Sequence, residues 1–173
     1  KNATTAFKDY LAAHPEDQIA QRALEGAQNA SALRTKGSLY TVKPATLFNN
    51  NRSDYAPVLL NEGKDRQLYF TTTRTATQGN QLSGITGLKN GDIYVANVDE
   101  KGNWKRPEAI AAVNTADDEG AVCFSPDGKT MYLTVCPTHP QYPRPARIYT
   151  SARADASWSK PQPLELLSDT LSN

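Results

Sequence analysis

The sequence predicts a mainly β chain that is preceded by a pair of helices. Three observations support this fold class. Residues 3–34 are rich in alanine and carry apolar side chains at helical spacing. From Ser38 onward, short segments rich in β-branched and aromatic residues alternate with turn residues. The second part also repeats itself internally. With 173 residues, 38% of them hydrophobic, the chain can bury one modest core or two small ones.

Residues 1–37 are expected to form a helical hairpin. Phe7, Tyr10 and Leu11 fall at i, i+3 and i+4 and share one helical face, and His14-Pro15 then interrupts the helix. The second helix carries an apolar stripe of mostly small residues: Ile19, Ala20, Ala23, Leu24, Ala27, Ala30 and Leu33. The hairpin looks like the end of a tetratricopeptide-type array. One such unit cannot bury its own face, so we expect further repeats upstream.

Short strands are expected in the remainder of the chain. The segments richest in β-branched and aromatic residues are 39–42, 68–72, 92–95, 131–135 and 147–150. The clearest turn signal is the run from Ser125 to Lys129, in which Pro126 presets φ and Asp127 accepts local backbone hydrogen bonds. Gly128 tolerates the positive φ that such a turn needs. A tight hairpin is therefore predicted between residues 122–124 and the strand at 131–135.

Self-comparison reveals a repeat in four parts. The matching stretches are NNRSDYAPVLL (50–60) with NTADDEGAVCF (114–124), QLYFTT (67–72) with TMYLTV (130–135), GDIYVA (91–96) with ARIYTS (146–151), and GNWKRPEAI (102–110) with ASWSKPQPL (156–164). In this alignment Asn50 is opposite Asn114, and Asp54 is opposite Asp118. Four strand candidates in about 40–60 residues are typical of a propeller blade. We therefore predict part of a WD40-like β-propeller in residues 38–173: two four-stranded antiparallel blades at about 50–110 and 114–164, and the start of a third at 168–173.

Residues 39–43 take the place of an outermost strand that has no blade of its own. Tyr40 precedes Asn50 by ten residues, as Trp104 precedes Asn114. Since helices and no other strands come before this segment, we expect it to close a ring by pairing with a last blade. A propeller has about 4–8 blades, so at least two more are expected after Asn173.

Composition and motifs argue against several functions. Lys and Arg number 19 and Asp and Glu 18, so no basic field exists for nucleic acid. The apolar runs are too short to span a membrane. Neither His14 nor His139 belongs to a metalloprotease or nucleophile motif. The acidic run 117–119 lacks the ligand spacing of a calcium loop, and Asp54 and Asp118 are read instead as caps of the turns before the innermost strands. We expect no catalytic, cofactor-binding or metal-binding residue and no enzymatic activity.

The tryptophans and cysteines have structural interpretations. Trp104 and Trp158 occupy equivalent places in the repeat, which favours packing of an outer strand against the neighbouring blade. Counting outward from the Pro-Asp turn sets Cys123 near Tyr132. Cys136 then lies roughly 13 Å farther along the strand, beyond the ~7 Å between Cα atoms that a disulfide allows. We therefore expect no bond between the two cysteines.

Two loops are the best candidates for interaction with other proteins. Residues 75–90 form a long polar, glycine-containing stretch, and residues 137–145 contain four prolines. Long or stiff loops on a rigid scaffold are where binding generally resides. The candidate interaction residues are Gln81, Ile85, Leu88, Tyr142 and Arg144.

Several motifs together resemble one protein family. SDYAP, QLYFTTTR, DIYVA, NWKRPE, NTADDEGA, FSPDGKTMYLT and WSKPQPL, in this order after the helices, are similar to the WD40-like Pro-Asp propeller repeats of OmpA-family lipoproteins from Bacteroidota, of the PorE-like type found in type IX secretion. The resemblance covers nearly the whole chain: the end of the tetratricopeptide part and the first two blades.

The resemblance implies a non-catalytic scaffold in the periplasm, associated with the outer membrane. Its implied partners are other envelope or secretion-complex proteins, and not nucleic acid. Peptidoglycan binding would belong to a C-terminal domain, and membrane attachment to a lipid anchor, neither of which is part of this sequence. The alternative is the propeller portion of a hydrolase, a prolyl-oligopeptidase-like peptidase or a glycosidase, whose catalytic domain lies outside this chain. An OmpA-like end or a G-x-S-x-G domain in a longer reading frame would separate the two.

Overall fold

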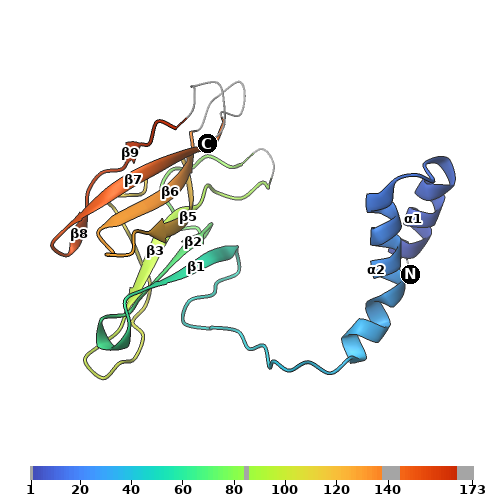
Figure 1. Cartoon of the computed structure of the whole chain (residues 1–173), viewed down its shortest axis with the longest axis horizontal. Helices are drawn as coiled ribbons and strands as arrows, with labels where there is room; N and C mark the ends of the chain where they lie inside the picture. The colour runs from blue at the N-terminus through green and yellow to red at the C-terminus, as the bar shows by residue number, and fades with distance from the viewer. Residues whose placement is uncertain (1, 84–85, 138–144, 167–173) are drawn as a thin grey trace. The chain divides into compact units, whose positions relative to one another are not determined.

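The computed structural model describes residues 2–83, 86–137 and 145–166. The chain divides into two compact units, Lys1–Lys43 and Pro44–Asn173. The first is helical and the second consists of curled antiparallel sheets, so the chain as a whole is mainly β, as predicted (Figure 1).

The first unit is the helical hairpin that the sequence predicts. Its two helices are α1 (Asn2–Ala13) and α2 (Gln18–Thr35). Asp17 is the N-cap of α2: its Oδ1 accepts hydrogen bonds from the backbone N–H groups of Ile19 (2.9 Å) and Ala20 (3.0 Å). The Tyr10 hydroxyl donates to Oδ2 of the same carboxylate at 3.1 Å and so connects the two helices.

The apolar faces of the two helices are only partly covered within the hairpin. Phe7 and Leu11 of α1 are half-buried, whereas Tyr10 is exposed. The predicted stripe on α2 is divided: Ala20 is buried, but Ile19 and Leu33 are 82% and 61% exposed. A hairpin of two helices has one internal contact face, so the remaining apolar side chains face solvent.

The second unit contains two sheets of antiparallel strands connected in sequence order. The first sheet has the order β1 (Asp54–Leu60), β2 (Gln67–Thr72), β3 (Asp92–Asn97) and β4 (Glu108–Ala109), with a 3-10 turn, η1 (Gly63–Asp65), between β1 and β2. The second sheet has the order β5 (Asp118–Phe124), β6 (Thr130–Cys136) and β7 (Arg147–Ala154); β8 (Ser157–Trp158) and β9 (Gln162–Pro163) both pair with β7. The strands predicted at 68–72, 92–95, 131–135 and 147–150 are confirmed. The second sheet has five strands rather than the predicted four, because Ser157–Trp158 pair with β7 where the first sheet has only the isolated bridge between Val98 and Trp104.

The two sheets share local irregularities as well as strand order. Each first strand contains a bulge at a residue with positive φ, Ala56 (50°) in β1 and Ala121 (44°) in β5. These two residues therefore occupy equivalent places, and the residues two positions before them are Asp54 and Glu119. The sequence alignment, which set Asp54 opposite Asp118, is wrong by one residue here. The alignment matched one acidic residue with another, whereas the strand pairing and the position of the bulge decide which residues of the two inner strands are equivalent.

The core lies between the two sheets. Alternation along β6 points every second side chain toward the first sheet, and these residues are buried. The core consists of Leu60, Tyr69, Ile93, Val113, Val122, Met131, Leu133, Val135 and Trp158. The two sheets thus stabilise one another, since each supplies part of one hydrophobic cluster.

The Pro-Asp hairpin between β5 and β6 has the predicted geometry. Gly128 has φ +66°, and Asp127 Oδ1 accepts hydrogen bonds from Ser125 Oγ (2.6 Å) and Lys129 N (3.0 Å). Cys123 pairs with Tyr132, so the expected register is confirmed, and Cys123 and Cys136 are both free.

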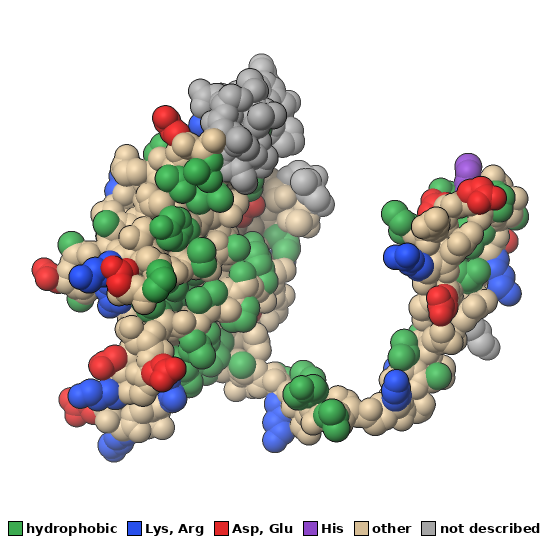
Figure 2. Space-filling model, viewed as in Figure 1, with side chains coloured by type: hydrophobic (Ala, Val, Ile, Leu, Met, Phe, Trp, Pro, Cys, Tyr) green, Lys and Arg blue, Asp and Glu red, His purple; other side chains and the backbone are tan. Residues whose placement is uncertain are grey.

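Residues 39–43 form no strand, contrary to the segment's composition. Leu39, Tyr40 and Val42 are 98%, 80% and 91% exposed. Figure 2 shows hydrophobic side chains protruding from the stretch that joins the two units. A strand needs a partner edge, and within residues 2–83, 86–137 and 145–166 no strand pairs with this segment. Its assignment as a closing strand stays a prediction.

Candidate functional site

The candidate interaction loops leave both sheets at the same end. The β2–β3 connection (73–91) and the β6–β7 connection (137–146) occupy equivalent places in the two sheets, at the end where β1 and β5 begin. Asp54, Asp118 and Glu119 are within the first two residues of these strands and so lie at the end of the unit where β2 and β6 end. We call it the loop end.

The described part of the β2–β3 loop is held by specific polar contacts. Lys89 Nζ donates hydrogen bonds to the backbone oxygens of Thr75 (3.0 Å) and Thr77 (2.7 Å). Gln78 N donates to Asp92 Oδ2 at 2.9 Å. One lysine and one aspartate thus bind the two arms of the loop together, which suits a loop that presents a fixed surface.

The structure places two of the five predicted interaction residues. Gln81 is exposed and lies directly before an isolated β-bridge between Leu82 and Lys89. Leu88 is half-buried, and its carbonyl accepts a hydrogen bond from Ser83 N at 2.8 Å. Leu88 therefore lies on the inner side of this bridge and Gln81 just outside it, both in the β2–β3 loop. The other three lie outside the described residues: Ile85, Tyr142 and Arg144.

In the first sheet, the acidic residue at the start of the inner strand is paired with an arginine. Asp54 accepts hydrogen bonds from Asn50 N (3.0 Å) and Asn50 Nδ2 (2.8 Å), and forms an ion pair with Arg74 at 3.2 Å. The Arg74 guanidinium also donates to the Phe48 carbonyl at 3.0 Å and lies 4.5 Å from the centre of the Tyr94 ring. A carboxylate and a guanidinium neutralise each other here.

In the second sheet, the equivalent carboxyl group is Glu119, which is completely buried. It accepts hydrogen bonds from the Thr115 backbone N–H (3.1 Å) and the Thr115 hydroxyl. Burial raises the pKa of the Glu119 carboxyl to about 7; the bonds from Thr115 oppose this, and the negative charges of Asp92 and Asp117 add to it. The protein thus carries a buried carboxyl group that titrates near neutral pH.

Asp92 is the functional candidate that the sequence did not reveal. It is fully buried at the start of β3, and its Oδ1 has no hydrogen-bond partner among the residues that the structure describes. Burial raises the pKa of Asp92, Gln78 N and Lys89 lower it, and Asp118 raises it. The sequence does not reveal that Asp92 is buried beside another carboxyl group, because Asp92 lies in a strand pattern (DIYVA) and becomes close to Glu119 only when the two sheets pack.

The two sheets are in close contact at Gly91, next to Asp118 and Glu119. A Cβ on Gly91 would lie 2.9 Å from Thr71 Cγ2 and 3.0 Å from the backbone oxygen of Glu119. The Gly91 carbonyl accepts a hydrogen bond from Glu119 N (2.9 Å), and Gly91 N donates to Asp118 Oδ1 (2.7 Å). Only glycine fits at this contact between the sheets, and the neighbouring Glu119 side chain is buried between them.

Within the described residues, the acidic side chains of Asp54 and Glu119 at the loop end bind groups of their own strand starts. Among residues 2–83, 86–137 and 145–166, no group of three or more His, Cys, Asp or Glu side chains is placed to hold a metal ion. The carboxyl groups of Asp54 and Glu119 are engaged by neighbours that fold the strand starts. These groups therefore stabilise the starts of the inner strands.

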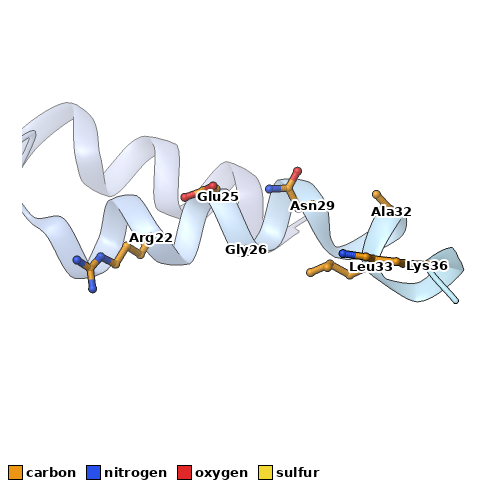
Figure 3. Close-up of a pocket in the computed structure, with 7 residues that line it drawn as sticks. All are labelled: Arg22, Glu25, Gly26, Asn29, Ala32, Leu33 and Lys36. Carbon is orange, nitrogen blue, oxygen red and sulfur yellow. The ribbon is translucent and has the colours of Figure 1, made fainter. Parts of the chain in front are cut away.

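Two of the hollows lined by described residues lie on the first sheet and along α2. One hollow, of about 200 Å³, lies on the face of the first sheet that points away from the second sheet. It is lined by Ala45, Phe48, Asn49, Asp54, Tyr55, Pro57, Leu68 and Phe70. The other, of about 390 Å³, is an open groove along α2, lined by Arg22, Glu25, Gly26, Asn29, Ala32, Leu33 and Lys36 (Figure 3). Figure 3 shows these side chains spread along the helix rather than converging on one point.

Comparison with known proteins identifies no family. No protein-family model matches the chain, and no curated protein is significantly similar to it. Among the described residues, no helix has the length and apolar character needed to cross a membrane.

Proposed function

We propose that this chain is part of a β-propeller that acts as a non-catalytic scaffold for protein–protein interaction. The observation that carries the proposal is the repetition of one sheet design: strand order, bulge position and the turn before the inner strand recur, and the two sheets pack face to face over one core. Propellers are built from repeated antiparallel sheets, typically of four strands, each packed on the next; here the first sheet has four strands and the second has five.

The turn before the inner strand shows the repetition most clearly. In the first copy, the N–H groups of Phe48 and Asn49 both donate to the Ala45 carbonyl (2.8 and 2.9 Å). In the second, Val113 and Asn114 both donate to the Ile110 carbonyl (2.9 and 3.0 Å). The chain before Ile110 is the outer strand of the first sheet. By this equivalence the chain before Ala45, residues 39–43, is an outer strand whose own sheet is the last blade of the ring.

The helical hairpin is proposed to be the end of a tetratricopeptide-like array. Its exposed Ile19 and Leu33 and the groove along α2 provide a face on which a neighbouring helical repeat could pack. Such arrays and propellers both serve as interaction platforms.

The proposed setting is the periplasm, at the outer membrane, in a complex such as the type IX secretion system. This part of the proposal rests on the motif resemblance and on the loop end, where a braced loop presents Gln81 and Leu88. Attachment to peptidoglycan and to the membrane is assigned to segments outside this chain.

The test is retention of envelope proteins by the immobilised chain from a detergent extract of Bacteroidota membranes. Lys89→Met removes the brace of the β2–β3 loop and should abolish retention of type IX secretion components. Lys64→Met, an exposed lysine in η1 at the opposite end of the first sheet, is the matched control and should retain them. Equal retention by both variants, or none by the unaltered chain, would overturn the proposal.

The hydrolase alternative places its catalytic domain outside this chain, so a longer reading frame that contains a G-x-S-x-G domain would support it and an OmpA-like end would contradict it. That this chain carries no catalysis of its own is tested with the same preparation. Incubation with peptide and glycoside libraries should yield no turnover. Turnover that a single substitution in this chain abolishes would show that the propeller carries catalysis.

A further inference from the structure

A polar groove of about 390 Å³ lies at the end of the β unit opposite the loop end. One wall consists of the η1 turn, the start of β2 and the end of β3, all in the first sheet. The other wall is Arg153 of β7, in the second sheet. Figure 1 shows the turn between β1 and β2 at the end of the unit away from the β2–β3 loop. The groove is therefore formed where two sheets of this chain meet, and not on an outer sheet face.

Positive charge is concentrated in this groove. Three of its lining residues are cationic, Lys64, Arg66 and Arg153, and one is acidic, Asp65. Three cations and one carboxylate give the groove a net charge of +2, whereas the whole chain has a net charge of only +1 at pH 7. The groove thus attracts anions, although the chain as a whole is nearly neutral.

The described carboxylates leave this charge uncompensated. Among residues 2–83, 86–137 and 145–166, the single ion pair within 4.0 Å joins Arg74 and Asp54, at the opposite end of the unit. Asp99, in the turn that adjoins the groove, accepts hydrogen bonds from the backbone N–H groups of Lys101 (2.9 Å) and Asn103 (2.8 Å). Its carboxylate therefore holds its own turn together, and the cations of the groove remain for a ligand.

Both arginines of the groove are held in place by tryptophan rings. The guanidinium carbon of Arg66 lies 5.0 Å from the centre of the Trp104 ring, and that of Arg153 lies 5.6 Å from the centre of the Trp158 ring. Arg66 Nη2 also donates a hydrogen bond to the Gly102 carbonyl at 3.0 Å. A guanidinium that is already positioned loses less conformational freedom when it binds an anion. The two arginines are therefore preorganised.

The side-chain amides of the groove supply further hydrogen-bond donors. Gln67 Nε2 donates to Asn97 Oδ1 at 2.7 Å, and the Tyr69 hydroxyl donates to Gln67 Oε1 at 3.2 Å. Because both amide oxygens accept these bonds, the group that Asn97 offers to a ligand is its Nδ2 donor. An ionised carboxylate only accepts hydrogen bonds, so an amide donor beside guanidinium groups matches it.

The size and charge of the groove favour carboxylates over other anions. A volume of 390 Å³ is at the small end of the roughly 300–1,000 Å³ that is typical of ligand sites. A nucleic acid needs many phosphate contacts along its backbone, and three cations in one groove do not supply them. Asp65 lies in the groove and repels a doubly charged phosphate more strongly than a singly charged carboxylate.

We propose that this groove binds the carboxylate groups of an acidic peptide segment. The Arg153 guanidinium pairs with one carboxylate, Asn97 Nδ2 donates to it, and Arg66 and Lys64 attract the neighbouring acidic side chains of the segment. The bound segment contacts both sheets, since Arg153 comes from one and the other residues from the other. The inference does not depend on the scaffold role, because the groove and the interaction loops lie at opposite ends of the unit.

The test is titration of a fluorescently labelled hexaglutamate peptide with the 173-residue chain, followed by fluorescence anisotropy. We expect saturable binding and none of the corresponding hexaglutamine peptide. Arg153→Met should weaken binding about tenfold, because it removes a charge-assisted hydrogen bond. Arg52→Met makes the same change of charge at an exposed arginine of the loop end and should bind as the unaltered chain does.

A second variant should strengthen binding. Asp65→Asn removes the only acidic side chain of the groove and should lower the Kd about threefold, a gain that misfolding cannot produce. Lys89→Met, which lacks the brace of the β2–β3 loop, should bind the peptide normally, so this proposal and the scaffold role can fail separately.

Competition identifies the chemistry of the ligand. Succinate should displace the labelled peptide only at concentrations well above those of unlabelled hexaglutamate, and inorganic phosphate should be no better than succinate. Displacement by succinate as readily as by hexaglutamate would overturn the assignment to a peptide, and stronger displacement by phosphate would overturn the assignment to carboxylates. Absence of binding, or equal loss in Arg153→Met and Arg52→Met, would overturn the site itself.

Discussion

The inner strands of the two sheets begin with acidic residues in the same backbone position but in opposite electrostatic surroundings. Asp54 is paired with Arg74, which follows β2. At the place equivalent to Arg74 in the second sheet the chain has Pro137, and Glu119 is surrounded by Asp92 and Asp117. One site is neutralised by a guanidinium and the other by a proton. The difference shows that a repeat can keep its backbone while the source of the neutralising charge changes.

The largest expected effect comes from breaking the first pair. Arg74→Met removes the cation beside Asp54, whose side chain is only 8% exposed, and leaves a nearly buried carboxylate without its partner. Since breaking a buried pair by removing one member is costly, the free energy of unfolding should fall by about 3 kcal/mol. Urea denaturation at pH 7.5 measures it. A loss below about 0.5 kcal/mol would show that Asn50 alone is enough to hold Asp54.

The second site should make stability depend on pH in the direction set by a raised carboxyl pKa. Glu119 keeps its proton in the folded protein up to about pH 7, whereas the unfolded chain releases it near its ordinary pKa of 4.5. The folded state therefore binds more protons between these values, and stability falls as pH rises from about 4.5 to 7, then levels off.

Glu119→Gln isolates this contribution. The variant removes the ionisation but keeps a group that can accept from Thr115, so it should be more stable than the unaltered chain at pH 8 by about 2 kcal/mol. At pH 5 the two should be nearly equal. Unfolding curves at both pH values provide the check, and an equal difference at both would rule out titration of Glu119 as the cause.

The β1–β2 and β5–β6 turns allow a smaller comparison. Gly128→Val should cost about 1 kcal/mol or more, because φ at this position is +66° and the new Cβ would lie 3.3 Å from Leu60 Cδ1. Gly63→Val has a similar φ of +61° but no atom within 4 Å of the new Cβ, so it should cost less. Thermal unfolding of both variants separates backbone strain from crowding. Equal losses would show that the contact with Leu60 is unimportant.

The smallest effect is expected in the segment before the first sheet. Leu39→Ser should change the stability of this chain by less than about 0.5 kcal/mol, because Leu39 is 98% exposed. A larger loss would show that residues 39–43 already pair with a sheet. In a longer protein that contains the proposed last blade, the same substitution should be destabilising, and that contrast would sharpen the closing-strand prediction.

Much of the fold could be predicted because it is determined by local signals. The Ser125–Lys129 turn contains residues whose conformational preferences match the turn, and alternation along β6 shows which side chains are buried. The helix break at His14-Pro15 and the cap at Asp17 are local as well. The one-residue error at Asp54 arose because the alignment matched acidic residues, whereas the equivalence is set by the pairing of each inner strand with its neighbour, which the sequence of one strand does not show.

The candidate site was predictable only at its surface. The long β2–β3 loop was visible as a polar, glycine-containing stretch, so Gln81 and Leu88 could be named. The brace by Lys89 and the burial of Asp92 were not visible, since each depends on residues brought together from different strands and loops.

The sequence by itself determined the two helices, the strand order within each sheet and the repetition of one sheet design, because these follow from side-chain periodicity and turn chemistry over short distances. Only the tertiary structure decided that Glu119 rather than Asp118 is the counterpart of Asp54, and that its pKa rises to about 7. The physical reason is that register and burial are properties of packed sheets. A carboxyl group acquires its charge state from all the groups around it, including Asp92, which lies 27 residues away in the chain and adjacent only after folding.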